Sequence, residues 1–563
     1  MNQDTHHVVP QCTLAHYEKN CRDLHLLHGV LRKWAKEKPA ATALINADRR
    51  SEVSWAAFDG VTTALAAELL RRGFRKGDFL ATSLPFLTEH VFLEYACFKI
   101  GVIHAPLDLR LHPPEVIRCL SLIRPKGYAF LGKTAAADFR ELGKAVRQHC
   151  PSVEHLLQFS PEEETIDGAE PFSRFAKAAQ SAPPEGVEDV TIGEHDGVQV
   201  IFTTGSTGPP KPALLSHRNI TCQNMCLGAA FGFDQDTRIL INLPPSHVGG
   251  QAETLMTALF CGGAAVLLEV FDATRSLRAI QDYGVNLLGQ IPAMFQFEWR
   301  LPEYANYDLS SLKTVVYGGQ GVPHEFLARL AAMAPRMATG LGLTEAAGFC
   351  TYTPLTDSVD EVAAGLGFAM PVYPISIRQP MRDNGRAGDE LPDGETGHIC
   401  FRGPQTFLGY VNDPEATART VSSDGYLYTG DMGFKDGRGL HLAGRARLVI
   451  KPAGYQVFPG DVENHICALA DKVASCGVVG AEHRTLSEAI VAFVEKKPGV
   501  ELTVQELKNH ARALASFMRP LHYVLLEPGQ MPLNRVVKTD YLRLRQMARE
   551  EVARLRASRR WDD

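Results

Sequence analysis

The sequence predicts an α/β protein: a large N-terminal domain of layered α/β subdomains with a β-barrel-like portion, followed by a small α+β C-terminal domain. The chain has 563 residues, whereas a single hydrophobic core stops growing at roughly 250–300 residues. From about residue 24 to 290, apolar runs of strand length alternate with helical patterns, which is typical of largely parallel sheets covered by helices. After Gly444 the pattern changes to that of a compact α+β unit. We therefore predict domains at 1–444 and 445–563.

Hydrophobic periodicity predicts the first elements of the large domain. Residues 55–73 predict a helix, because apolar side chains recur at helical spacing and Gly73 supplies a stop. The apolar run 78–84 predicts a strand, and residues 89–100 predict the helix that follows it. The longest apolar runs, such as 262–270, have strand length.

The later part of the chain is built from shorter strands. Residues 380–397 are polar and rich in glycine, proline and aspartate, as in an exposed connection. Short strand-like runs separated by turns follow at 397–401 and 440–442, within the portion expected to resemble a barrel. In the small domain, the pattern predicts strands at 475–480, 488–495 and 522–526 and helices at 503–515 and 541–560.

Composition excludes several classes of protein. The apolar fraction of 45% and the charged fraction of 22% are those of globular proteins rather than disordered or fibrous ones. The net charge of −6 gives no global attraction for nucleic acid. The twelve cysteines lack metal-ligand spacing, so we expect reduced thiols, mostly in the core. Neither a secretory signal nor a run of roughly 20 apolar residues is present, which predicts a cytoplasmic protein without a membrane span.

A loop with the composition of a phosphate-binding site follows a predicted strand at 200–202. Glycines let backbone N–H groups approach an anion, hydroxyls add donors, and a terminal lysine supplies positive charge. The spacing is not that of the Walker motif, and from composition alone a flexible surface loop is an equal alternative. The candidate ligands in this loop are Thr203, Thr204, Gly205, Ser206, Thr207, Gly208 and Lys211.

This loop resembles the phosphate-binding signature of the adenylate-forming superfamily, which includes acyl-CoA synthetases, firefly luciferase and peptide-synthetase adenylation domains. Other segments that resemble superfamily signatures follow in the expected order. They include Pro244–Gly250, Tyr317–Gly321, Gly342–Glu345, Gly397–Pro404 with Gly409–Tyr410 and Pro414–Thr417, Tyr426–Asp431, Gly444–Glu463 and Pro532–Lys538. The resemblance covers about residues 24–547 and is strongest to the AMP-forming acyl-CoA synthetases.

In the large domain, the resemblance implies roles for five residues. His247 would lie near the acyl pocket and the path of the thiol. Thr344 would donate to phosphate, and Glu345 would bind magnesium, which prefers hard oxygen ligands. The loop expected to contact adenine contains Gly318, Gly319 and Gln320.

Further roles follow around the predicted boundary. Asp431 would hold the ribose hydroxyls, as acidic residues do in dinucleotide-binding folds, and Arg445 would contact ribose or phosphate. By resemblance, a mobile small domain turns about Arg447. This movement would withdraw Lys538, which reaches the carboxylate and the α-phosphate, and bring Gly454 to the site.

Three positions depart from the superfamily pattern. Pro212 follows the phosphate-loop lysine in place of the usual glycine, which would stiffen the loop. Leu341 replaces an aromatic residue that commonly packs on adenine. Val537 replaces the glycine before the catalytic lysine, and a β-branched residue resists positive φ.

The predicted function is that of an AMP-forming carboxylic acid:CoA ligase that uses ATP, Mg²⁺ and coenzyme A, with Lys538, His247, Thr344 and Glu345 as catalytic residues. Peptide-synthetase adenylation domains usually keep an Asp just after the histidine segment to bind an α-amino group, whereas here 248–252 offers no acid before Glu253. The resemblance therefore favours an apolar fatty or aryl acid over an amino acid. Three alternatives stay open: loading of a separate carrier protein, a catalytically silent nucleotide- or acyl-binding homologue, and a luciferase-like oxygenase. The oligomeric state cannot be predicted.

Overall fold

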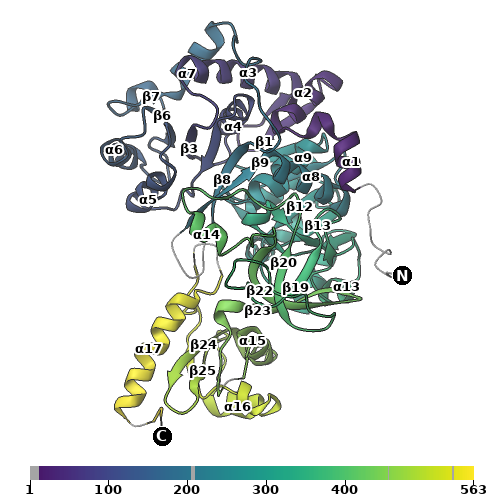
Figure 1. The fold of residues 1–563 in the computed structure, drawn as a ribbon, viewed down its shortest axis with the longest axis vertical. Helices are drawn as coiled ribbons and strands as arrows, with labels where there is room; N and C mark the ends of the chain where they lie inside the picture. Colours follow the sequence, from purple (N-terminus) through teal and green to yellow (C-terminus); the bar gives the residue numbers. More distant parts are fainter. Residues whose placement is uncertain (1–11, 204–209, 454, 535–537, 559, 563) are drawn as a thin grey trace.

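The computed structural model describes residues 12–203, 210–453, 455–534, 538–558 and 560–562. A large N-terminal portion precedes a small C-terminal unit, which lies at the bottom of Figure 1. This arrangement confirms the predicted α/β class with a large and a small part. The boundary at 444/445 stays a prediction; the last strand of the large portion, β23, runs from Gly439 to Arg445.

Two large sheets form the framework of the N-terminal portion. One has eight strands in the order β21-β9-β8-β4-β3-β5-β6-β7, and the other has seven in the order β14-β13-β12-β10-β11-β1-β2. Most neighbours are parallel; β9 pairs antiparallel with β8 and β21, and β2 pairs antiparallel with β1. The strands are β1 (Thr42–Asn46), β2 (Ser51–Ser54), β3 (Phe79–Ser83), β4 (Ile103–Pro106), β5 (Gly127–Leu131), β6 (His155–Phe159), β7 (Glu170–Pro171), β8 (Gly197–Thr203), β9 (Lys211–Ser216), β10 (Arg238–Ile241), β11 (Ala264–Leu267), β12 (Leu287–Gln290), β13 (Thr314–Tyr317), β14 (Arg336–Ala338) and β21 (Gly409–Tyr410).

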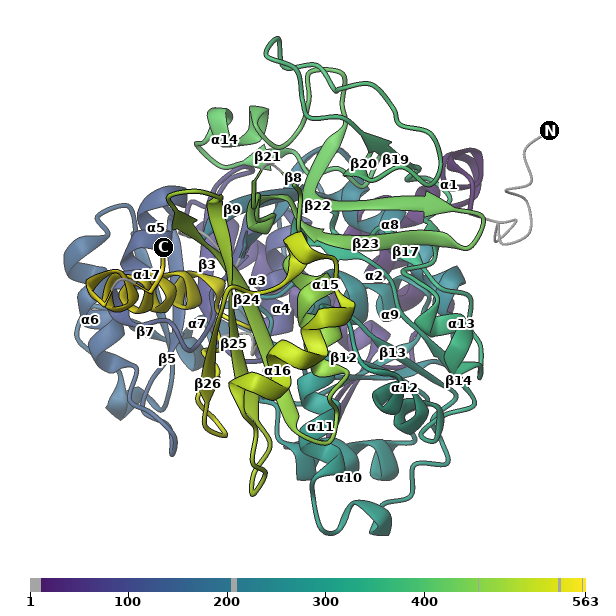
Figure 2. The same ribbon diagram turned by 90° about the horizontal axis from the view of Figure 1, so that it is seen from below.

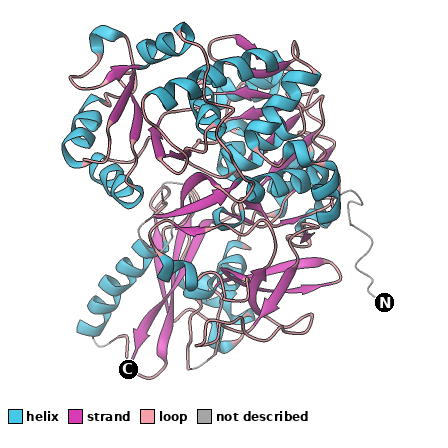
Figure 3. Ribbon diagram, turned by 45° about the horizontal axis from the view of Figure 1, so that its top comes forward, coloured by secondary structure: helices cyan, strands magenta, loops and turns pink. Residues whose placement is uncertain are grey.

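Helices cover both faces of these sheets (Figure 3). Successive strand residues point to opposite faces, so Leu80 and Ala81 of β3 belong to two different cores. In the seven-stranded sheet, Ile239 packs into a core that the two sheets share, whereas Leu240 packs on the far side. The helices of this portion are α1 (Leu14–Asn20), α2 (Leu27–Glu37), α3 (Trp55–Arg71), α4 (Thr88–Lys99), α5 (Pro113–Ile123), α6 (Arg140–His149), α7 (Phe172–Ser181), α8 (His217–Phe231), α9 (Thr257–Phe260), α10 (Ala273–Tyr283), α11 (Pro292–Trp299), α12 (His324–Ala331), α13 (Val359–Ala363) and α14 (Pro414–Ala418).

The portion predicted to be barrel-like contains an antiparallel four-stranded sheet in the order β19-β20-β22-β23. Two short ribbons, β15-β16 and β17-β18, lie between the large sheets and this one in the sequence. Their bounds are β15 (Gly342–Leu343), β16 (Gly348–Phe349), β17 (Thr351–Tyr352), β18 (Phe368–Ala369), β19 (Ile375–Arg378), β20 (Gly397–Phe401) and β22 (Leu427–Asp436).

The C-terminal unit has its own sheet and its own cores. Val478 and Val479 point to opposite faces of this sheet, one toward α15 and α16 and the other toward α17, as Figure 2 also shows. Both cores contain only residues after Leu448, so the unit buries its apolar faces by itself. Its elements are α15 (Pro459–Cys467), β24 (Val473–His483), β25 (Ser487–Lys496), α16 (Val504–His510), β26 (His522–Leu526) and α17 (Tyr541–Ala557).

The predicted elements are found with a few changes at their ends. The helix predicted at 55–73 is α3, and Gly73 follows it with a φ of 85°. The apolar run 262–270 contributes only β11, because Gly262 adopts a φ of 80° after α9 and the N–H of Glu269 bonds the Asp48 carboxylate. The helix predicted at 503–515 is α16, continued by one short 3₁₀ turn.

All twelve cysteines are free, and ten of them are buried. Within the described part of the chain, no helix combines the length and the apolar character that crossing a bilayer requires.

Candidate active site

A cavity of about 1280 Å³ lies between the N-terminal portion and the C-terminal unit. It opens beyond the carboxyl ends of β10, β12, β13 and β14, which is where parallel sheets usually bind ligands. All the predicted site residues that the structure describes line it: Thr203, Lys211, His247, Gly318, Gly319, Gln320, Thr344, Glu345, Asp431, Arg445 and Lys538. The other predicted residues, Thr204, Gly205, Ser206, Thr207, Gly208 and Gly454, lie outside the described residues.

The candidate phosphate loop joins two antiparallel strands. Thr203, at the end of β8, pairs with Lys211, at the start of β9, and the N–H of Lys211 donates to the Thr203 hydroxyl at 3.4 Å. The loop thus differs from a Walker loop, which leads from a strand into a helix. The Lys211 ammonium lies 4.8 Å from the centre of the Tyr410 ring, close enough for a cation–π interaction.

Glu345 has a partner that the sequence did not reveal. The hydroxyl of Tyr410 donates to Glu345 Oε1 at 2.6 Å, and burial raises the pKa of this phenol. Tyr410 therefore contacts both the candidate magnesium ligand and the phosphate-loop lysine. Sequence analysis had included Gly409–Tyr410 only among the segments that resemble superfamily signatures, without a role in binding or catalysis.

Asp431, Arg445 and Lys538 form the charged end of the cavity. Asp431 and Arg445 face each other across β22 and β23, with 2.8 Å between Asp431 Oδ1 and Arg445 Nε. Burial raises the pKa of Asp431, although Arg445 and Lys538 oppose this shift. Burial lowers the pKa of Lys538, and the Arg445 charge lowers it further.

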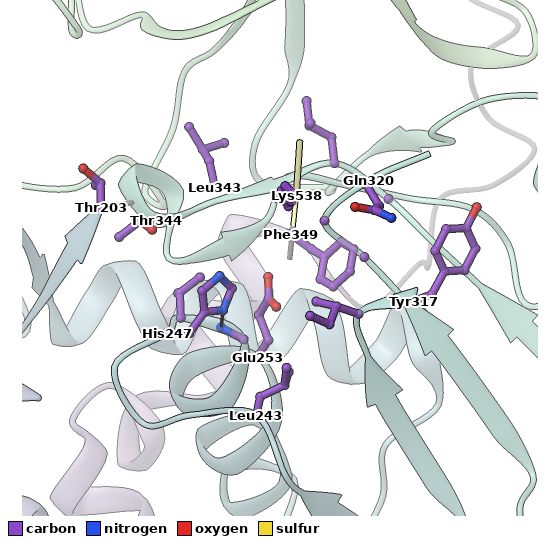
Figure 4. Close-up of a pocket in the computed structure, with 18 of the residues that line it drawn as sticks. Thr203, Leu243, His247, Glu253, Tyr317, Gln320, Leu343, Thr344, Phe349 and Lys538 are labelled. Atoms are coloured by element: carbon purple, nitrogen blue, oxygen red, sulfur yellow. Dashed lines mark hydrogen bonds between the residues drawn. The ribbon is translucent and has the colours of Figure 1, made fainter. Parts of the chain in front are cut away.

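The lysine comes from the C-terminal unit and reaches the loop that follows β13. Its Nζ lies 3.6 Å from the position that a Cβ on Gly319 would take, and Gly319 has a φ of 96°. Figure 4 shows Lys538 and Gln320 in the same cavity. The structure thus brings together two predicted segments that are more than 200 residues apart in the sequence.

His247 is held in a defined tautomer. The backbone N–H of Gly249 donates to its Nδ1 at 3.0 Å, so Nδ1 is an acceptor and the proton of the neutral ring is on Nε2. Burial, followed by the nearby Lys538 charge, lowers the pKa of His247 to about 4. At neutral pH this side chain is therefore an uncharged imidazole.

The chain after His247 forms a π-helix over Gly249–Met256, which sequence reasoning missed. The hydroxyl of Thr254 donates to the carbonyls of Gly249 and Gly250. A Cβ at Gly250 would lie 2.6 Å from the carbonyl oxygen of Pro244, so this approach requires glycine. Helices of this kind are frequent at functional sites.

The π-helix also carries Glu253 into the cavity. Burial raises the pKa of its carboxyl group to about 8, with an opposing contribution from the backbone N–H of Phe349. Sequence analysis had noted Glu253 only as an acid beyond the segment that could bind an amino group. Its position in the cavity wall follows from the π-helix, which hydrophobic periodicity does not distinguish from an α-helix.

Two of the three departures from the superfamily pattern lie within the described residues. Leu341 is half-buried and lines the cavity. An aliphatic side chain thus occupies the position at which the superfamily commonly has an aromatic one. Pro212 is a residue of β9 and pairs with Phe202. Val537 lies outside the described residues.

Outside the cavity, Glu18, His25 and Glu194 come close enough together to hold a metal ion. Arg218, however, forms ion pairs with both Glu18 and Glu194. A fixed guanidinium between these carboxylates favours an ion-pair network over a metal centre.

Comparison with known proteins places these observations in a family. The sequence model of the AMP-binding enzyme family matches residues 31–411, and that of the AMP-binding enzyme C-terminal domain matches residues 461–538. The chain is 28% identical to a feruloyl-CoA synthase from Amycolatopsis over 86% of this chain and 92% of that protein. It is 26% identical to a 4-coumarate–CoA ligase from Pinus taeda over 85% and 87%. Among solved structures, ATP-bound MatB from Rhodopseudomonas palustris shares the fold, with a TM-score of 0.80 and 23% identity over 93% of this chain and 98% of that one.

Proposed function

This chain belongs to the AMP-binding enzyme family, and we propose that it is an AMP-forming ligase that joins an apolar carboxylic acid, fatty or aryl, to coenzyme A. The observation that carries the proposal is the meeting of Lys538, Asp431, Glu345 and His247 in one cavity. These residues supply positive charge, a candidate ribose ligand, a candidate magnesium ligand and a neutral imidazole. The named CoA ligases among the relatives favour coenzyme A as the acceptor.

In the first step, the substrate carboxylate attacks the α-phosphorus of ATP, and pyrophosphate leaves. Two anions repel each other, so this step needs positive charge at the reacting atoms. Lys538 supplies that charge from the C-terminal unit, and Lys211 supplies it from the phosphate loop. The Glu345 carboxylate offers the hard oxygen that magnesium prefers, and the bound ion would offset phosphate charge.

In the second step, the thiol sulfur of coenzyme A attacks the acyl carbon of the acyl adenylate. A carbon–sulfur bond forms, the carbon–oxygen bond to AMP breaks, AMP leaves, and the thiol proton is released to solvent. We assign the path of the thiol to the side of His247, whose neutral ring adds no charge there. The second step also requires Lys538 to leave the cavity, and we propose that the unit after Gly444 turns about Arg447 to withdraw it.

The cavity wall favours an acid with an apolar body. Next to the charged end, the lining includes aliphatic and aromatic side chains from several elements. They include Leu243, Val270, Phe271, Met294, Phe297, Val316 and Phe349.

Acid-dependent exchange of labelled pyrophosphate into ATP tests the first step. The panel should contain short, medium and long fatty acids and aryl acids, and each active acid should then be incubated with coenzyme A. Exchange followed by thioester formation is the expected result. Exchange without thioester would favour a separate carrier protein as the acceptor, and no exchange with any acid would contradict the proposal and favour a silent binding protein.

A further inference from the structure

Glu253 places a carboxyl group inside the wall of the cavity. In Figure 4 its side chain stands between His247 and Phe349 and points into the open space. Glu253 Oε2 lies 3.3 Å from the position of a Cβ on Gly249, and Oε1 lies 3.1 Å from that of a Cβ on Gly342. Oε1 also lies 2.7 Å from the position of a Cβ on Gly348. The carboxyl group thus packs against glycine backbone, while the half-buried side chain lines the cavity.

This carboxyl group has no cationic partner among the described residues. Its neighbours on the wall are the neutral ring of His247 and the apolar side chain of Phe349, and only the Phe349 N–H stabilises its charged form. Because no cation offsets its charge, this half-buried carboxyl group favours the protonated form. Burial accordingly raises its pKa to about 8, and Glu253 presents an O–H donor at neutral pH.

We propose that Glu253 donates a hydrogen bond to an oxygen of the acyl group, and thereby selects acids that carry a hydroxyl or oxo group over hydrocarbon acids of the same shape. This inference rests on the proposed function. A hydrocarbon acid would cover the Glu253 O–H without pairing it, and a buried donor without a partner is costly. Sites built to bond a substrate oxygen reject analogues that lack it more strongly than apolar pockets reject added groups.

Ionisation of Glu253 would weaken the binding of the acid. An ionised carboxyl group no longer donates, and its negative charge repels the incoming acid anion. The titratable groups beside it are His247, whose Nδ1 lies near the same Gly249 position, and Cys350, whose pKa the Glu253 charge raises; Lys538 lines the same cavity. His247 titrates far below neutrality, and burial raises the pKa of Cys350. Because burial lowers the pKa of Lys538, a Glu253 variant is needed to separate the contribution of Glu253 to the pH profile from that of Lys538.

Matched pairs of acids test the selectivity directly. Each pair consists of a hydrocarbon acid, such as 3-phenylpropanoate, and counterparts with a hydroxyl or oxo group at successive positions. The ratio of kcat/KM in pyrophosphate exchange should favour one oxygenated acid by about tenfold or more. Glu253→Gln keeps an N–H donor and should keep most of this preference, whereas Glu253→Leu should bring the ratio close to one.

The pH dependence of KM for the acid is a second readout. In the wild type, KM should rise as pH increases through about 8, the value to which burial raises the Glu253 pKa; this rise should be absent in Glu253→Gln. Glu298→Gln is the matched control, because burial raises the pKa of Glu298 to about 8 as well, yet Glu298 is not part of the cavity wall. Glu298→Gln should behave as the wild type in both readouts.

The failure of this inference can be distinguished from that of the proposed function. Exchange with several acids and a ratio near one for every matched pair in the wild type would overturn the role of Glu253 but keep the ligase. An unchanged preference in Glu253→Leu, in protein whose melting temperature and ATP binding match the wild type, would also overturn it. If Glu253→Leu does not fold, the pH profile of Glu253→Gln decides, and a rise in KM like that of the wild type contradicts the inference.

Discussion

At the scale of single residues, Tyr410 connects two charged parts of the candidate site. Its hydroxyl donates to Glu345, and its ring lies under the Lys211 ammonium. Tyr410→Phe removes the donor but keeps the ring. A hydrogen bond to a charged group contributes about 1.5–3 kcal/mol, so we expect kcat/KM for MgATP to fall by about tenfold or more in pyrophosphate exchange.

Two further variants separate the two contacts of Tyr410. Tyr410→Leu removes both the donor and the ring and should be less active than Tyr410→Phe. Tyr426→Phe is a control, because the Tyr426 ring lies against Arg378 and Arg402 and is absent from the cavity wall. Unchanged kinetics in Tyr410→Phe would contradict the role of the hydroxyl.

Lys538 is the residue for which we expect the largest single effect. Lys538→Ala should lower the rate of adenylation by about 100-fold or more, because it removes a charge that opposes the repulsion between two anions. It should spare the attack of coenzyme A on supplied acyl adenylate. Lys508→Ala, on the exposed side of α16, is the control, and equal loss in both half-reactions would refute this division of roles.

Side chains that act through their neighbours were the hardest to predict from the sequence. Lys538, Asp431 and Glu345 were proposed from motifs, and the structure brings them into one cavity. Tyr410 and Glu253 were not proposed, because their chemistry depends on a partner or on burial that arises only when distant segments pack.

At the scale of elements, the first residue of α8 predicts a pH effect on stability. His217 is fully buried; its Nδ1 accepts the N–H of Leu27 at 3.2 Å. Burial lowers its pKa to about 3, whereas an unfolded histidine titrates near 6.5. Below pH 6.5 the unfolded chain therefore binds a proton that the folded chain excludes, and acid destabilises the fold.

His217→Gln keeps an acceptor but removes the titration. Each pH unit between about 6.5 and 3 is equivalent to about 1.4 kcal/mol for this group. Between pH 6.5 and 5, urea denaturation should therefore show the wild type losing about 2 kcal/mol more than the variant. His195→Gln, at a side chain that is 74% exposed, should follow the wild type, and parallel losses in His217→Gln would disprove the expectation.

Regular elements followed from periodicity, and irregular ones did not. The helix α3 and the strands of the C-terminal unit lie close to their predicted ranges because alternation and helical spacing reflect faces that are buried. The π-helix after His247 was not foreseen. It brings Gly250 close to the Pro244 carbonyl, and such an approach between backbone atoms leaves no pattern in the side chains.

At the scale of the whole molecule, the sequence predicted a large and a small part because their patterns differ. The separate cores on the two faces of the C-terminal sheet account for that difference. The resemblance predicted that Lys538 of the small part reaches the site, but the rest of the contact between the two parts could not be predicted, since the cavity between them is lined by residues from many segments. Their relative movement is likewise a proposal that the fold permits.

The position of Lys538 beside Gly319 has a consequence for kinetic order. If Lys538 acts in adenylation as proposed, this position of its Nζ is the arrangement for the first step, and the thiol reacts only after the lysine has withdrawn. Pyrophosphate should therefore leave before coenzyme A reacts, as in a ping-pong scheme. Initial rates measured at several fixed acid concentrations should give parallel lines in reciprocal plots against coenzyme A when pyrophosphate is removed continuously, whereas intersecting lines would mean that both substrates occupy the protein together.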